Sequence, residues 1–397
     1  WSDNVARRGT PVAGFVGGVF QGAAGISGPI VVSWTHGMRM SKHAFVFAIT
    51  VMFAITGAVQ IVSMTALGLW TVERFAVAVV GAAVVGFITP VIMRMGRKII
   101  TGFWEDDDVQ KKLGSWMRSA IGAVESRKLK VMRFGDNMRN VAVTEGDKVG
   151  VQMQLGWQVN SWGVGDLVRE LEQVSEAEVD EQMEVYRSRY EFATKDLETV
   201  RYQAREEVAM RKFLQREGAY AYTNTFEDLQ QMRQLPGLAS QNLMAEGYGY
   251  GGEGDWKVSA MTSLIKRMTE GLGGGTTFME DYTYHLEKGN ELSLGAHMLE
   301  ICPSITTDKA RIEVHELGIG GKEPPARLVF EGHPGNAILA SLVDMGGRVR
   351  LIVNEIEVVK PIYRMPNLPV ARVMWKPQPD LNQASHLWML AGGAHHA

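Results

Sequence analysis

Two long runs without a charged side chain constrain the fold of this chain more than any other feature of its sequence. Residues 44–70 form the first run and residues 75–93 the second. Each run is long enough to cross a bilayer as a helix. Residues 11–35 are also uncharged, but their glycines and Pro29 are typical of a re-entrant or discontinuous segment. Residues 1–97 are therefore predicted to be an α-helical transmembrane fragment.

The charges divide the chain at the same place. Residues 1–98 hold two acidic and eight basic side chains, a formal net charge of +6, and the other 299 residues hold 42 acidic and 33 basic ones, a net charge of −9. The basic flanks of the runs place the N-terminus and everything after residue 98 in the cytoplasm. We therefore expect residues 11–93 to lie in the inner (cytoplasmic) membrane. The alternative is a buried helical hairpin of a soluble protein.

A glycine-rich stretch in this front part, GFVGGVFQGAAGISGPIVV (residues 14–32), is similar to a segment of the TauE/SafE family of sulfite and anion exporters. The resemblance implies that residues 1–97 are a fragment of such an exporter. A working exporter of that family needs both of its halves, so three segments are too few for independent transport.

The rest of the chain has a mixed α/β pattern. A helix is predicted over residues 105–125, strands over 128–135 and 148–159, and one or two surface helices over 176–217. From about residue 305 the pattern changes to strands without intervening helices. These predicted strands are residues 310–319, 326–332, 348–359 and 369–377. We expect an α/β central domain over residues 98–305 and a β-rich, antiparallel, barrel-like C-terminal domain over residues 306–397.

Composition excludes some classes of function. Cys302 is the only cysteine, so the chain has no internal disulfide and no CxxC metal site, and a reducing compartment such as the cytoplasm is expected. No basic run with interleaved aromatic residues occurs in the soluble part, so nucleic acid is not an expected partner. GYGYGG (residues 247–252) fits the letters of a dinucleotide fingerprint, but it follows a helical segment where that mechanism needs a strand.

Four residues in the last third carry the most chemistry: Glu253, Glu280, His297 and His396. They lie in polar or glycine-broken stretches that read GEGDWK, FMEDYTYH, GAHMLE and GGAHH. Two carboxylates and two imidazoles make a mixed oxygen and nitrogen set, which suits a divalent metal such as Mn²⁺. His297 lies between apolar neighbours and is either a core histidine or a ligand. His395 and His396 follow AGGA, a poor setting for packing and a plausible one for coordination.

Long motifs follow one another from about residue 98 to the end of the chain. Among them are RFGDNMRNVAVTEGDKV (133–149), TNTFEDL (223–229), GYGYGGEGDWK (247–257), GGGTTFMEDYTYH (273–285), LGAHMLEICPSI (294–305), HELGIGGKEPPARLVF (315–330), LPVARVMWKPQPD (368–380) and LAGGAHH (390–396). In these motifs the chain resembles bacterial L-arabinose isomerase. The resemblance implies that Glu253, Glu280, His297 and His396 bind a catalytic Mn²⁺, and that Phe226 and Met298 lie near the sugar.

The implied reaction converts L-arabinose to L-ribulose by moving a proton between C1 and C2 through an enediol-like intermediate. A metal can stabilise the negative charge that develops, and two carboxylates can exchange roles as general base and general acid. By resemblance, Glu253 and Glu280 are the candidates for proton transfer, and His297 and His396 are mainly ligands. Asp281, next to Glu280, is a candidate for orienting a ligand.

The resemblance also implies a homo-oligomer, and an N-terminal α/β domain that we expect this chain to lack because the apolar front occupies its place. We therefore predict a fusion of a TauE/SafE-like fragment with an L-arabinose isomerase that is impaired by the missing domain. The first alternative is a membrane anion transport component with a non-catalytic cytoplasmic appendage. The second is a sugar-binding relic that does not turn over its ligand.

Overall fold

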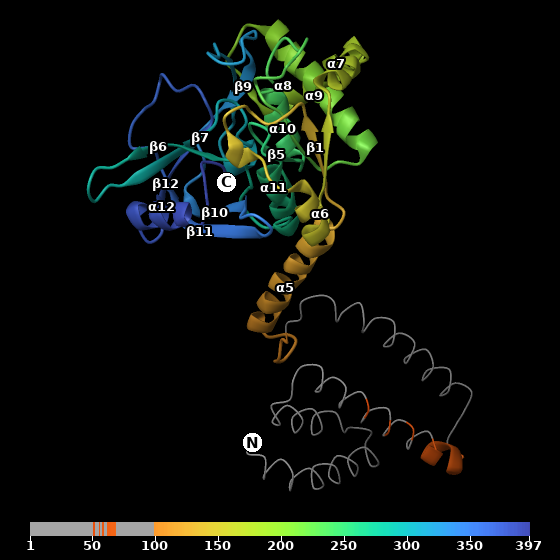
Figure 1. The fold of residues 1–397 in the computed structure, drawn as a ribbon. Helices are drawn as coiled ribbons and strands as arrows, with labels where there is room; N and C mark the ends of the chain where they lie inside the picture. Colours follow the sequence, from red (N-terminus) through yellow and green to blue (C-terminus); the bar gives the residue numbers. More distant parts are fainter. Residues whose placement is uncertain (1–50, 52–54, 56–57, 59–61, 69–98) are drawn as a thin grey trace. The chain divides into compact units, whose positions relative to one another are not determined.

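The computed structural model describes residues 51, 55, 58, 62–68 and 99–397. The chain divides into two compact units, Trp1–Ile99 and Ile100–Ala397. In the first unit, residues 62–66 are helical and Gly68 follows with a φ of 62°. The second unit carries the sheets and helices that position the candidate site (Figure 1).

The predicted membrane segments fall mostly on residues outside this description. Residues 11–35 and 75–93 lie outside it completely, and residues 44–70 lie outside it except for residues 51, 55, 58 and 62–68. None of the helices in the described part combines the length and the apolar character that a bilayer crossing requires. The predicted fold class is therefore corrected: the described chain is mixed α/β, and no transmembrane fragment is shown.

A parallel sheet with strand order β2-β1-β4-β5 forms the centre of the first half of the second unit. Successive residues of a strand face opposite sides of a sheet. Val131 of β1 accordingly packs with Trp256 and Ala260 of α11, whereas Met132 belongs to the cluster that contains the apolar residues of α9 and α10. The sheet is thus covered by helices on both faces. Its strands are β1 (Lys130–Phe134), β2 (Gln158–Trp162), β4 (Ala221–Thr223) and β5 (Gly249–Gly251).

Some of the helices around this sheet were predicted from the sequence, and one predicted strand is a helix. The prediction of α5 (Asp107–Ser126) and of two helices in residues 176–217 is confirmed. α9 is not a surface helix, however, because its apolar face and three polar side chains, Gln203, Glu206 and Glu207, are buried. The other helices are α7 (Val164–Glu172), α8 (Glu176–Arg189), α9 (Leu197–Glu217), α10 (Leu238–Ala245) and α11 (Trp256–Met268).

A helix replaces most of the strand predicted over residues 148–159. Residues Lys148–Leu155 form helix α6, and only then does β2 begin. The side chain of Asp147 accepts a hydrogen bond from Gly150 N at the start of this helix, and Gly156 ends it with a φ of 88°. These two local end signals outweigh the alternating pattern, because Val149 and Met153 are exposed and bury nothing.

The second half of the unit contains a five-stranded antiparallel sheet in the order β10-β11-β12-β7-β6. The prediction of antiparallel strands is confirmed, but among the described residues the sheet is open, with edge strands β10 and β6, and is not a closed barrel. Its strands are β6 (Glu280–His285), β7 (Leu292–Ala296), β10 (Gly335–Asp344), β11 (Val349–Val359) and β12 (Arg372–Pro377), and helix α12 (Leu381–Leu390) follows them.

A small third sheet, in the order β3-β8-β9, joins the two halves. β3 (Glu191–Phe192) comes from the helical half, whereas β8 (Arg311–Val314) and β9 (Ala326–Val329) follow the short helix η2 (Pro303–Ile305). One continuous apolar cluster runs from Phe213 of α9 through Tyr250 and Phe278 to Trp375 of β12. Because residues on both sides of position 305 share this core, the two halves are packed as neighbours. The predicted domain boundary at residue 305 stays a prediction.

Candidate metal and active site

The candidate site begins at the carboxyl ends of the parallel strands, the usual binding edge of an open parallel sheet. Glu253 follows β5 by two residues, and Asn224 and Phe226 follow β4. Asn224 O accepts a hydrogen bond from Gly254 N at 3.2 Å, and Glu253 O accepts one from Met138 N at 3.0 Å. The loops after β1, β4 and β5 therefore hold one another in place around Glu253.

Glu253 has a backbone conformation that L-residues other than glycine rarely adopt, with a φ of 61°. It stands between Gly252 and Gly254, which let the chain turn sharply from β5 into α11. A strained glutamate at the tip of a turn is held there by its surroundings, and such positions concentrate at functional sites. The turn directs the half-buried Glu253 side chain towards the C-terminal segment.

The opposite wall is formed by β6 and the segment 395–397, which pair with each other. Met279 and Ala397 exchange two backbone hydrogen bonds of 2.9 Å each, and Asp281 N donates to His395 O at 3.1 Å. This pairing sets Glu280 directly opposite His396. Residues 116 positions apart in the chain are thus neighbours because the segment extends the edge of β6.

Three side chains come close enough to share one metal ion: Glu253, His395 and His396. Glu253 Oε2 lies 3.4 Å from His395 Nε2 and 3.7 Å from His396 Nε2. Their ligand atoms all lie within 4.8 Å of one another, the only such group of three among the residues that the structure describes. Two of the four ligands predicted from the sequence are in this group, and His395 joins them.

His297, the third predicted ligand, directly follows β7 and is buried. Its Nδ1 lies 2.5 Å from Glu300 Oε2, while Tyr250 donates its hydroxyl hydrogen to the other carboxylate oxygen at 3.2 Å. The far side of the ring faces the turn at Glu253, because a Cβ atom on Gly252 would lie 3.1 Å from His297 Nε2. A side chain at position 252 would therefore crowd that nitrogen, and the glycine permits the close approach.

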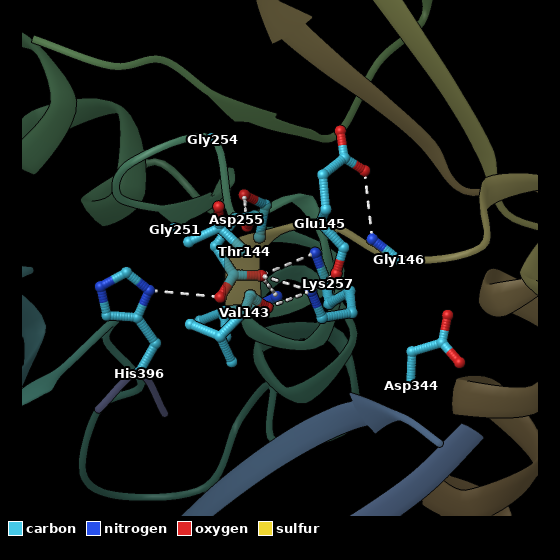
Figure 2. Close-up of polar contacts among 12 residues, drawn as sticks. Val143, Thr144, Glu145, Gly146, Gly251, Gly254, Asp255, Lys257, Asp344 and His396 are labelled. Atoms are coloured by element: carbon cyan, nitrogen blue, oxygen red, sulfur yellow. Dashed lines mark hydrogen bonds and ion pairs between the residues drawn. The ribbon is translucent and has the colours of Figure 1, made fainter. Parts of the chain in front are cut away.

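His396 is supported in the same way by a different carboxylate. Its Nδ1 lies 3.2 Å from Asp255 Oδ2 (Figure 2), and both side chains are buried. Its Nε2 is buried as well and makes no hydrogen bond to any residue that the structure describes. The ring of Phe278 packs against both imidazoles in T-shaped contacts, with its centroid 4.9 Å from each. Both imidazoles therefore have their Nδ1 atoms occupied; the Nε2 atom of His396 faces Glu253, and that of His297 faces Gly252 in the same turn.

Charges of opposite sign shift the pKa values of these groups. Burial would raise the pKa of Glu253, but its hydrogen bond from His395 and the nearby His396 and His297 hold it below its ordinary value. Burial would lower the pKa of His297, but Glu300, Glu280 and Glu253 raise it. The hydrogen bond to Glu253 raises the pKa of His395, and Glu280 and Asp281 add to this. Glu280, the fourth predicted ligand, thus acts electrostatically on both His297 and His395.

Phe226 and Met298, the residues expected near the sugar, both pack at the margin of the main core. Met298 directly follows His297, and Tyr282 donates its hydroxyl hydrogen to the Met298 sulfur at 3.8 Å. The glycine-containing loop after β8 passes beside Phe226, since a Cβ atom on Gly320 would lie 3.1 Å from Phe226 O. The two residues lie on separate loops, after β4 and after β7, and contact with a sugar stays a prediction.

Sequence reasoning missed two carboxylates and undervalued one histidine. Asp255 and Glu300 orient the imidazoles, and His395 contacts Glu253. Glu300 could have been found as an acid three residues after His297, whereas no local signal connects Asp255 with His396. Asp281, the predicted orienting residue, accepts a hydrogen bond from the Tyr284 hydroxyl, and burial raises the pKa of its carboxyl.

Comparison with known families gives three consecutive matches. Residues 76–128 match the L-arabinose isomerase N-terminal domain, residues 130–271 the central domain and residues 275–397 the C-terminal domain. The prediction that the N-terminal domain is lacking is therefore wrong, because part of the chain matches it. That match also includes most of the second uncharged run, and no match to the TauE/SafE family was found. The predictions of an exporter fragment, of a fusion and of the membrane as a partner are therefore not supported either.

Individual relatives carry the same name. The chain is 57% identical over 310 residues to the L-arabinose isomerases of Anoxybacillus flavithermus and Geobacillus stearothermophilus, and 54% identical over 306 residues to that of Thermotoga neapolitana. Each alignment covers 77% of this chain and 62% of the relative. The chain thus spans about three fifths of the length of the curated relatives that it matches.

Proposed function

We infer that this chain belongs to the L-arabinose isomerase family, and we propose that it isomerises L-arabinose to L-ribulose with the help of a bound divalent metal. The family assignment is supported by three domain matches in the order N-terminal, central and C-terminal, and by relatives at 57% identity. A homo-oligomer and a cytoplasmic location belong to the same proposal.

The proposed metal is Mn²⁺, held by Glu253, Glu280, His297 and His396. The observation that carries this proposal is His396 Nε2, a buried ring nitrogen without a hydrogen bond among the described residues, 3.7 Å from Glu253 Oε2. Such an atom is costly to bury unless something binds it. The donors fit a divalent metal, because neutral imidazoles and carboxylates together suit Mn²⁺ better than a thiol site would. His395 is an additional candidate ligand.

The carboxylates can perform the proton transfer. Aldose–ketose isomerisation removes a proton from C2 of the aldose and delivers one to C1. The histidines around Glu253 lower the pKa of its carboxyl, so the carboxylate is ionised in the metal-free chain. We propose that Glu253 and Glu280 alternate as base and acid from the two walls of the site. A bound metal would stabilise the negative charge that develops on the sugar oxygens.

The apolar surroundings support the same chemistry. The buried Phe278 ring contacts both imidazoles, and we propose that Phe226 and Met298 bind the sugar beside them. A site closed off from water strengthens the electrostatic interactions inside it.

The test is conversion of L-arabinose to L-ribulose by the purified chain, treated with a chelator and then given Mn²⁺. Glu280→Gln removes one carboxylate without changing the size of the side chain, and we expect it to abolish turnover. Glu181→Gln, on the exposed side of α8, is the matched control and should leave turnover unchanged. An unchanged rate in Glu280→Gln would remove Glu280 from the mechanism. Binding of Mn²⁺ and L-arabinose by the wild type without turnover would indicate a sugar-binding relic instead.

A further inference from the structure

A buried lysine lies behind His396, on the side away from the proposed metal. Lys257, in the first turn of α11, is only 3% exposed. Its ammonium group donates hydrogen bonds to Val143 O at 2.8 Å and to Glu145 O at 2.5 Å, and lies 3.7 Å from Asp255 Oδ1 (Figure 2). Lys257 therefore connects the loop after β1 to the carboxylate that supports His396.

The two oxygens of Asp255 have separate roles. Oδ1 caps α11, because it accepts hydrogen bonds from Lys257 N and Val258 N at 3.1 Å each. Oδ2 lies 3.2 Å from His396 Nδ1. The ammonium group of Lys257 approaches Oδ1, so it interacts with the carboxylate oxygen that does not contact the histidine. These residues form a single line of contacts, which runs from Lys257 through Asp255 and His396 to Glu253.

The other imidazole has a different arrangement. Glu300, which supports His297, accepts a hydrogen bond from Tyr250, and no lysine or arginine is in ion-pair contact with it among the described residues. The buried Arg327 acts on Glu300 only electrostatically and donates a hydrogen bond to Met298 O at 3.2 Å instead. A buried ion pair is costly to desolvate and adds little stability by itself. A cation in direct contact with the supporting carboxylate of only one histidine points to a positional role, because His396 lacks the regular strand that precedes His297.

We propose that Lys257 is a positioning residue that, through Asp255, fixes the His396 ring with Nδ1–H on Asp255 and the Nε2 lone pair directed at Glu253. The proposal rests on the proposed function for its link to metal binding, but the ring orientation itself is a property of the chain. Carboxylates behind a ligand histidine typically change metal affinity 10- to 100-fold when removed. Lys257 lies one contact further from the proposed metal, and its effect on metal affinity is transmitted through Asp255.

The experiment compares Lys257→Met with Lys266→Met in the metal-free and Mn²⁺-loaded chain. Lys266 is the matched control, since it lies on the same helix and donates to a backbone oxygen, Thr276 O, at 2.7 Å, away from Asp255. The first readout is the tautomer of His396 in ¹⁵N-histidine NMR spectra of the metal-free chain, with His396→Gln identifying the signal. The second is the dissociation constant for Mn²⁺.

We expect Lys257→Met to abolish the single Nδ1–H tautomer of His396 and to weaken Mn²⁺ binding 10- to 100-fold, whereas Lys266→Met changes neither by more than twofold. The double variant Lys257→Met with Asp255→Asn should bind Mn²⁺ no more weakly than Asp255→Asn alone, because both act along one line of contacts. Lys257→Arg, which keeps the charge, should recover part of the affinity and is measured as well in case Lys257→Met does not fold.

An unchanged tautomer in Lys257→Met, or additive losses in the double variant, would overturn the proposal even if the wild type binds Mn²⁺. A wild type that binds no Mn²⁺ would overturn the proposed function, and the metal-free NMR comparison would still decide the role of Lys257.

Discussion

His297 and His396 each direct Nδ1 at a buried carboxylate, Glu300 in one case and Asp255 in the other. Glu300 lies three residues from its histidine in the same loop after β7, whereas Asp255 lies 141 residues from His396. We call these pairs the His297 branch and the His396 branch. The first is built from one continuous piece of chain. The second requires the start of α11, the loop after β1 and the pairing of residues 395–397 with β6.

The difference shows how one type of support can be built from local or from distant residues. In the His297 branch the strand fixes the backbone, and the histidine needs only a carboxylate and the Tyr250 hydroxyl. In the His396 branch the backbone is held by a short bridge, and a buried cation stands behind the carboxylate. We therefore expect the two branches to respond differently when the carboxylate is neutralised.

The largest effect is expected from Asp255→Asn. The variant leaves Lys257 buried without its counter-charge, and breaking a buried pair in this way costs about 3–5 kcal/mol. We also expect a 10- to 100-fold loss of Mn²⁺ affinity. Urea unfolding of the metal-free chain measures the first effect, and titration with Mn²⁺ measures the second. A loss of stability below about 1 kcal/mol would show that the ion pair contributes nothing to the His396 branch.

Glu300→Gln should have the smaller effect on stability. Among the described residues no lysine or arginine in ion-pair contact loses a partner, and the buried Arg327 loses only its electrostatic interaction with Glu300. The amide can still accept from Tyr250, so the cost is that of impaired buried hydrogen bonds, about 1–3 kcal/mol. Mn²⁺ affinity should still fall about 10-fold, because the orientation of His297 is weakened. The same two measurements apply. Equal losses of stability in Glu300→Gln and Asp255→Asn would erase the distinction between the branches.

A third prediction tests whether buried carboxylates outside both branches behave differently. Burial raises the pKa of Glu207 to about 7, although Arg211 opposes the shift. A folded-state pKa above the unfolded value of 4.5 means that the stabilising contribution is complete below about pH 4.5 and is lost as the pH rises through 7. Relative to Glu207→Gln, the wild type should lose about 1 kcal/mol per pH unit between pH 5 and 7. Urea unfolding of both chains, free of metal, measures this; parallel curves would contradict it.

The fold could be predicted where pattern and end signals agree. α5, β1 and the strands at β11 and β12 were predicted from periodicity, whereas α6 was misread because its alternating residues are exposed and its ends are set by Asp147 and Gly156. The hydropathy of the first hundred residues also led to a wrong prediction, that of a transmembrane fragment. An uncharged run suits a protein interior as well as a bilayer, so composition alone does not choose between them.

The site was partly predictable for a related reason. Glu253, Glu280, His297 and His396 were named from family resemblance, and the structure places them at the ends of β5, β6, β7 and the last segment. Their assignment as ligands stays a prediction. Asp255 and Lys257 were not predicted as part of the site, because they stand at the start of a helix, where an acidic residue is usually interpreted as an N-cap. Only the tertiary contact with His396 shows their second role.

The pairing of residues 395–397 with β6 has a consequence for biosynthesis. A ribosome adds about 5–20 residues per second, so His396 is made on the order of 5–20 s after His297. Throughout that interval the nascent chain already contains Glu253, Glu280 and His297, but the bridge opposite Glu280 does not exist. The pairing opposite Glu280 therefore forms only after the central and antiparallel sheets have been synthesised, and the proposed capture of a metal by all four residues would be a late step in the maturation of the chain.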